Sequence, residues 1–257
     1  MKKLLYTSIF VSILLCAAIH VYALSPAIQA VVSAASIQTD LCTNSLTFSW
    51  HAESTTVTEG GIAGGVNNGC SAGDTTASAS GSPTIETTDN KSDGIKAAYF
   101  NVPNEKFSFT AANIVGVDQG TIDFHIYPTT LGNASIFRYS DGANNYIFVT
   151  IAGGTEIEVN YRAGGTLTYC RTSGANVVVN TLQRVVAKYR QTGTPNIYVS
   201  VNGVTCTSNV DASTWNASVD GFTLGENNGS ALVFFLDNIQ IYSAYMSTGS
   251  GLRSDLP

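Results

Sequence analysis

Glu156 and Glu158 are the acidic residues whose spacing best suits catalysis. Residues two apart on a strand share one face, and two carboxylates so placed could act as acid and nucleophile in glycoside hydrolysis. A solvent-facing polar strand edge explains the same pair, and no third acid lies between them. We therefore predict no catalytic residues and no enzymatic activity.

Asp123 and His125 form a second pair on one expected strand face. A carboxylate beside an imidazole can tune a general base, but two outward polar positions of an ordinary strand look the same. Beyond His20, near the N-terminus, His51 and His125 are the only histidines, so we do not expect a transition-metal site built on imidazole. A Gly-x-Ser-x-Gly nucleophile motif is also absent.

Polar loops supply possible ligand contacts. Sugars are held by aromatic stacking together with hydrogen bonds from Asn and Asp side chains. Asn and Gly also serve as turn residues because they tolerate left-handed backbone, and a tryptophan can equally cap a core. The candidate ligand contacts are Asp141, Asn144, Asn145, Trp215, Asn227 and Asn228.

Four cysteines follow the N-terminal segment that contains Cys16. They are Cys42, Cys70, Cys170 and Cys206. In an oxidising compartment they allow three pairings. We predict Cys42–Cys70 and Cys170–Cys206, because the first two share one N-terminal block and the last two flank two expected strands. Without a C-x-x-C spacing, a zinc site is not expected.

The first 23 residues are typical of an export signal. Lys2 and Lys3 precede an apolar run over residues 4–18, which is shorter than the ~20 residues needed to cross a bilayer. Val21 and Ala23 fit the small-x-small cleavage rule. We expect a signal peptide over 1–23 and a secreted or cell-surface protein, with no membrane insertion once the signal is removed.

Composition excludes several classes. Charged residues make up only 12% of the 257 residues, and the formal net charge is −6 with only 12 Lys and Arg. An acidic chain without a basic patch argues against a nucleic-acid partner. The 44% hydrophobic content argues against disorder as the main state.

Alternation of apolar and polar residues recurs about every ten residues, separated by turn signals such as Asp141-Gly142 and Asn202-Gly203. This pattern predicts a sandwich or barrel of antiparallel strands. The alternating apolar positions are Leu46, Phe48 and Trp50; Ile122, Phe124 and Ile126; Ile157, Val159 and Tyr161; Ile197, Val199 and Val201; and Ile239 and Ile241.

Four ranges follow from these patterns: the signal peptide at 1–23, an N-terminal arm at 24–44, one β domain at 45–245 and a short tail at 246–257. Within the domain, residues 58–94 read as a long, partly irregular connection. The apolar part of the arm, 24–41, could be a flexible leader, an edge strand of its own sandwich or a strand donated to a neighbouring subunit.

Several segments, in order, resemble the concanavalin A-like lectin/glucanase superfamily and its laminin-G-like domains. They are LTFSWHAE (46–53), GTIDFHIYP (120–128), IFRYSDGANNYIFV (136–149), IYVSVNGV (197–204), FTLG (222–225) and FLDNIQIY (235–242). The resemblance implies a two-sheet antiparallel jelly roll that binds glycans or proteins. The Glu-x-Asp-x-Glu motif of the family's glucanases is absent, which agrees with binding without catalysis.

The resemblance also implies a structural calcium ion. Members of this family often bring an acid near the first strand to an Asp on the last strand. In this sequence the corresponding residues are Glu53 and Asp237, with loop carbonyls around Gly94 completing the shell.

Two functions follow as leading hypotheses. The first is an exported, non-catalytic module that binds a glycan or a surface protein. The second is a structural subunit of an extracellular filament or sheath that self-assembles through the N-terminal arm. A glycan-cleaving enzyme is a third and weaker alternative, because the carboxylate motif is missing.

Overall fold

A computed structural model describes residues 46–50, 56–58, 61–63, 77–87, 91–92, 96–109, 115–209, 214–215, 221–225 and 232–246. All of them belong to one compact unit, 42–257. The expected signal peptide and arm lie outside these residues, and so does the expected tail apart from position 246. Five residues named in the sequence analysis also lie outside them: Cys42, Cys70, Glu53, Asn227 and Asn228. No helix long and apolar enough to span a bilayer occurs among the described residues.

Every regular element in these ranges is a β-strand. The strands are β1 (Leu46–Trp50), β2 (Thr56–Thr58), β3 (Gly61–Ala63), β4 (Ala77–Ser80), β5 (Thr84–Thr87), β6 (Lys96–Phe100), β7 (Lys106–Phe109), β8 (Gln119–Pro128), β9 (Ala134–Ser140), β10 (Tyr146–Ala152), β11 (Glu156–Ala163), β12 (Thr166–Arg171), β13 (Gln183–Arg190), β14 (Ile197–Val201), β15 (Val204–Ser208), β16 (Phe222–Gly225) and β17 (Phe234–Tyr242).

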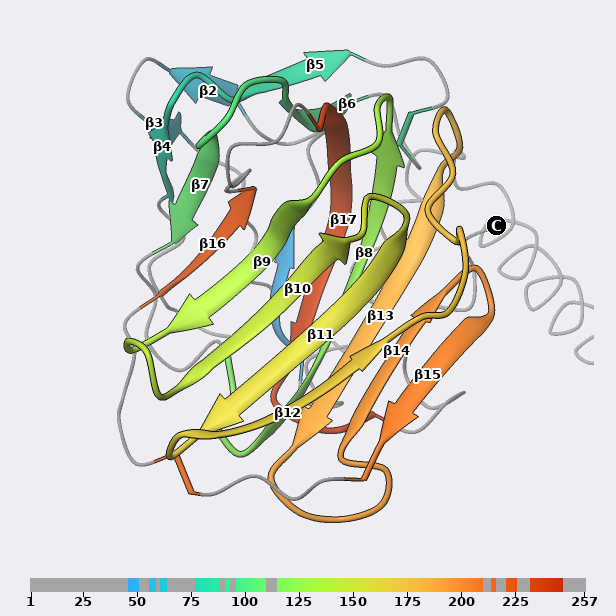
Figure 1. Cartoon of the computed structure of the whole chain (residues 1–257). Helices are drawn as coiled ribbons and strands as arrows, with labels where there is room; N and C mark the ends of the chain where they lie inside the picture. Colours follow the sequence, from blue (N-terminus) through green and yellow to red (C-terminus); the bar gives the residue numbers. More distant parts are fainter. Residues whose placement is uncertain are drawn as a thin grey trace, which may run out of the picture. The chain divides into compact units, whose positions relative to one another are not determined.

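The strands form two antiparallel sheets, with those of sheet B in front of sheet A in Figure 1. Sheet A has the order β15-β14-β13-β8-β17-β6-β5, and β1 also pairs with β17. Sheet B has the order β12-β11-β10-β9-β16-β7-β4-β3-β2. This is the two-sheet sandwich that the alternation predicts. The stretch expected to be irregular, 58–94, contains the short strands β3, β4 and β5.

The core lies between the inner faces of the two sheets. Ile147, Val149 and Ile151 of β10 are at most 1% exposed, as are the alternating apolar residues of β8, β11 and β14 apart from Phe124 at 2%. All of these residues belong to one hydrophobic cluster. Because strand side chains alternate between faces, the positions between them point outward.

β17 is an interior strand of sheet A, between β8 and β6, and is buried on both faces. Its register against β8 shifts between Asp237 and Gln240. Asn238 has a φ of 50° there, and left-handed backbone suits Asn in a β-bulge. The extra residue keeps Ile239 and Ile241 in the core, as the sequence pattern predicts.

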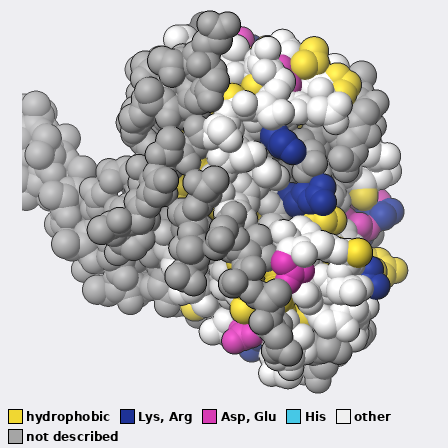
Figure 2. All heavy atoms as spheres, turned by 90° about the vertical axis from the view of Figure 1, so that its left-hand side faces the viewer, with side chains coloured by type: hydrophobic (Ala, Val, Ile, Leu, Met, Phe, Trp, Pro, Cys, Tyr) yellow, Lys and Arg dark blue, Asp and Glu magenta, His cyan; other side chains and the backbone are white. Residues whose placement is uncertain are grey.

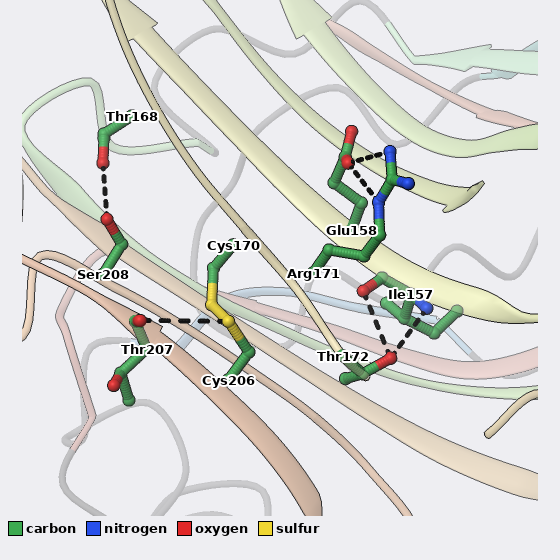
Figure 3. Close-up of a disulfide and its surroundings, with 9 residues drawn as sticks. All are labelled: Ile157, Glu158, Thr168, Cys170, Arg171, Thr172, Cys206, Thr207 and Ser208. Carbon is green, nitrogen blue, oxygen red and sulfur yellow. Dashed lines mark hydrogen bonds and ion pairs between the residues drawn. A yellow bond between two sulfur atoms is a disulfide. The ribbon is translucent and has the colours of Figure 1, made fainter. Parts of the chain in front are cut away.

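The expected Cys170–Cys206 disulfide is present and joins the two sheets (Figure 3). Cys170 lies on β12 and Cys206 on β15, which are the strands at one end of each sheet's order. The same two strands are also linked by the Thr168 and Ser208 hydroxyls, 3.3 Å apart. A covalent bond therefore joins the two sheets at their end strands, β12 and β15.

Replacing both cysteines, with Cys170→Ser and Cys206→Ser, should lower the free energy of unfolding. The bond closes a loop between residues 36 apart in sequence, so we expect a loss of about 2–4 kcal/mol, seen as a Tm lower by roughly 5–15 °C in thermal unfolding. As a control, Thr168→Val removes only the neighbouring hydrogen bond and should cost about 1 kcal/mol. An unchanged Tm in the double variant would contradict this role.

Candidate functional site

The outer face of sheet B carries aromatic side chains over β10 and β12. Since Ile147, Val149 and Ile151 fill the core, Tyr146 and Phe148 must face outward, and both are half-buried. On β12, Tyr169 is 57% exposed. Large aromatic groups at solvent-facing positions can contact a ligand through their apolar ring surfaces.

Two rows of paired residues cross this face. Strand register places Arg138, Phe148, Asn160 and Tyr169 in one row, from β9 to β12. The adjacent row holds Ser140, Tyr146, Arg162 and Leu167. We call these eight residues the aromatic face.

A ladder of rings and guanidinium groups runs diagonally through the aromatic face. The Tyr146 and Phe148 rings stack with centroids 4.3 Å apart. The Arg138 guanidinium lies 5.0 Å from the Phe148 centroid, and the Arg162 guanidinium lies 6.0 Å from the Tyr146 centroid. Cation–π contacts of this kind stabilise both partners. The ladder holds two positive groups in fixed positions on the face.

Tyr169 differs from the ladder rings because no described residue stacks on it. Its ring stands beside Asn160, its partner across β11 and β12. The Asn160 amide Nδ2 donates to Glu158 Oε1 at 2.7 Å, which fixes the amide group. An open ring on a paired strand, next to a positioned amide, suits the flat face and hydroxyl groups of a sugar.

Charge is dispersed over the described residues that are visible in Figure 2. In Figure 2, Lys and Arg, acidic and hydrophobic side chains occur as small separate groups among neutral ones. The described part of this face shows no extended positive patch of the kind typical of nucleic-acid binding.

The loop before β10 uses its polar groups internally. Asp141 Oδ2 accepts hydrogen bonds from Asn145 Nδ2 at 2.9 Å and from Trp215 Nε1 at 3.0 Å. Asn145 Oδ1 accepts from the Gly164 amide at 2.7 Å. The structure therefore brings Asp141, Asn145 and Trp215 together, but as a turn scaffold.

Trp215 is not an exposed stacking platform. Only 3% of its surface is exposed, and its ring packs 5.4 Å from Tyr139 and 6.4 Å from Tyr161. The core-capping interpretation is the one that fits. Asn144 is exposed at the loop tip, where its carbonyl accepts from the Gly165 amide at 3.0 Å.

Glu156 and Glu158 share the outer face of β11, as expected, and both contact Arg171 (Figure 3 shows Glu158). Glu158 Oε2 lies 2.6 Å from Arg171 Nε and 2.5 Å from Nη2, and Glu156 Oε2 lies 3.7 Å from Nη1. The Glu158 hydrogen bond raises the pKa of Arg171. One arginine thus compensates both carboxylates. Beside it lies a hollow of about 250 Å³, with Asn133, Ser135, Thr150 and Gly153 in its wall.

Asp123 and His125 lie on the outer face of sheet A but are only 5% and 3% exposed. Asp123 binds Arg184 through both oxygens, at 3.0 Å from Nε and 2.5 Å from Nη2. A carboxylate held by a bidentate arginine is a structural ion pair.

Asp237, the proposed calcium ligand, is 1% exposed on β17, opposite His125 of β8. The described residues contain no group of three or more His, Cys, Asp or Glu arranged to hold a metal. Of the residues expected to bind calcium, Asp237 is the one that lies among the described residues.

No motif in the sequence singled out Tyr146, Phe148 and Tyr169, or the ladder of rings and guanidinium groups. The sequence nevertheless contains a pattern that could have identified Tyr146 and Phe148. In residues 146–152 (YIFVTIA), every second residue is Ile147, Val149 or Ile151, as in a strand with one apolar face. With those three assigned to the core, the tyrosine and phenylalanine between them had to face solvent.

Comparison with known proteins identifies the fold. A family model described as the concanavalin A-like lectin/glucanases superfamily matches residues 92–249. A search of curated proteins finds no match.

Among solved structures, the botulinum neurotoxin serotype D binding domain superposes with a TM-score of 0.56 at 10% identity, covering 79% of this chain and 49% of that one. The binding domain of Paraclostridial Mosquitocidal Protein 1 gives 0.55 at 14%, with 82% and 51% covered. The binding domain of botulinum neurotoxin DC in complex with SialylT gives 0.55 at 10%, with 80% and 50% covered.

The chain thus spans about half the length of each of these structures, and at such low identity the likeness concerns the fold. The family model, by contrast, covers more than half of this chain. The protein therefore belongs to the concanavalin A-like lectin/glucanase superfamily.

Proposed function

We propose that this protein is an exported, non-catalytic module that binds glycans through the aromatic face of sheet B. The observation that carries the proposal is the open Tyr169 ring, 57% exposed beside Asn160. A large exposed aromatic on a rigid strand provides apolar contact area at low entropic cost. The lectins named in the family description and the toxin binding domain in complex with SialylT support a binding role.

Export is supported by the disulfide, because such bonds persist in oxidising compartments. Binding without catalysis is supported by the pairing of both β11 glutamates with Arg171. Both carboxylates already bind a guanidinium group. A surface protein remains the alternative partner, and binding tests decide between the two.

Tyr169→Ala should weaken glycan binding about tenfold, since exposed aromatic contacts at a binding centre are worth at least 1–2 kcal/mol. Tyr169→Phe should keep most of the affinity because the ring remains. Glycan-array screening of the wild type selects the ligand, and titration calorimetry compares the variants.

Tyr198→Ala is the matched control, because Tyr198 is a half-buried outward tyrosine on β14 of the other sheet. It should leave affinity unchanged. Equal losses in Tyr169→Ala and Tyr198→Ala would place the site elsewhere. No binding to any glycan would contradict the proposed function.

We also propose that a calcium ion bound at Asp237 stabilises the fold, with Glu53 as a second ligand. An ion that binds only the native state raises stability by about 2.7 kcal/mol at a hundredfold excess over its Kd. Saturating calcium should therefore raise the Tm by roughly 5–10 °C, and EDTA should reverse the shift. The shift should vanish in Glu53→Gln, measured by differential scanning calorimetry. A Tm that ignores both calcium and EDTA would contradict the ion.

A further inference from the structure

Arg162 is fixed on the aromatic face by backbone groups. Its Nε donates to the Gly165 carbonyl at 2.9 Å, and its Nη1 donates to the Ala143 carbonyl at 3.0 Å. The guanidinium also lies beside the Tyr146 ring. These contacts come from two turns and one strand, so the group is held in place before any ligand arrives.

The charge of Arg162 is not compensated by a carboxylate among the described residues. By contrast, Arg171 forms a salt bridge with Glu158. Arg184 forms one with Asp123. The carboxylate of the adjacent loop, Asp141, accepts instead from Asn145 and Trp215. Arg162 thus combines a fixed position with an unneutralised positive charge.

Arginine has five N–H donors, and the two backbone carbonyls take one from Nε and one from Nη1. The other Nη1 donor and both Nη2 donors therefore have no acceptor among the described residues. A planar pair of N–H groups matches the two oxygens of a carboxylate, and it also fits a sulfate. Because Arg162 is already ordered, little side-chain entropy is lost on binding.

We propose that the aromatic face selects acidic glycans, with Arg162 binding the anionic group of the sugar while Tyr169 stacks on a ring. This inference rests on the proposed glycan-binding function and adds the class of ligand. The shared chemistry is one anionic substituent on a sugar, which a carboxylate or a sulfate can supply.

The test compares matched glycans that differ only in charge. The probes are an oligogalacturonate and its methyl ester, sialyllactose and its methyl ester, and chondroitin oligosaccharides with and without sulfate. Titration should show the acidic member of at least one of the first two pairs binding about tenfold tighter or more, since charged hydrogen bonds contribute about 1.5–3 kcal/mol. A gain confined to the sulfated chondroitin identifies sulfate as the group that Arg162 binds.

Arg162→Gln should reduce the preference for the acidic member to near parity while binding of the neutral member persists. Arg190→Gln is the matched control, because Arg190 on sheet A makes the same kinds of contact, donating to the Pro195 carbonyl at 2.8 Å and lying 4.4 Å from the Tyr245 ring. It removes one positive charge from the other sheet and should keep the preference. Thermal unfolding checks that both variants fold.

A salt titration of the wild type tests the inference without a substitution. Raising the ionic strength should weaken binding of the acidic member and leave the neutral member unchanged. Equal affinities for both members of every pair, or a preference that survives in Arg162→Gln, would overturn the acidic-ligand inference and leave glycan binding standing. Failure of all probes to bind would overturn both proposals.

Discussion

Burial of one apolar face of each sheet against the other is the constraint on which the rest of the structure depends. In β10, Ile147, Val149 and Ile151 are almost fully buried, and each such side chain contributes about 1.5–3 kcal/mol. A slip of one residue would expose all three. The register is therefore fixed by the core, and the outward positions of Tyr146 and Phe148 follow from it.

Rigid closure of the sandwich gives the outer face its precision. Tyr161 of sheet B and Tyr189 of sheet A lie 5.3 Å apart in the core, and their hydroxyls donate to the carbonyls of Val117 and Gly116, each at 2.7 Å. Burial raises the pKa of both tyrosines, so they stay neutral donors. Together with the Cys170–Cys206 bond, they tie β11 and β12 to the other sheet, and these two strands carry Asn160, Arg162 and Tyr169.

The sequence predicts the class of fold well because alternation is local. The strand around Ile157 to Tyr161 and the turn at Asn202-Gly203, where both residues adopt positive φ, can be read from neighbouring residues. The site is harder to predict because its rows join residues of four strands, and pairing such as Phe148 with Arg138 is set by long-range register. Trp215 shows the same limit. The sequence leaves it open as a ligand contact or a core cap, and the choice depends on Tyr139 and Tyr161, which are distant in the chain.

The two outer faces differ in what a ligand can reach. Sheet A holds the side chains that resemble catalytic groups, yet Asp123, His125 and Asp237 are at most 5% exposed. Sheet B exposes Tyr169 and Leu167 and leaves Arg162 partly exposed. Both glutamates of β11 are paired with Arg171. These three acid–base groups of sheet A are thus buried, while groups suited to stacking and hydrogen bonding on sheet B are accessible. That division agrees with the proposed recognition of a sugar, in which Arg162 is the group on sheet B best placed to meet a negative charge.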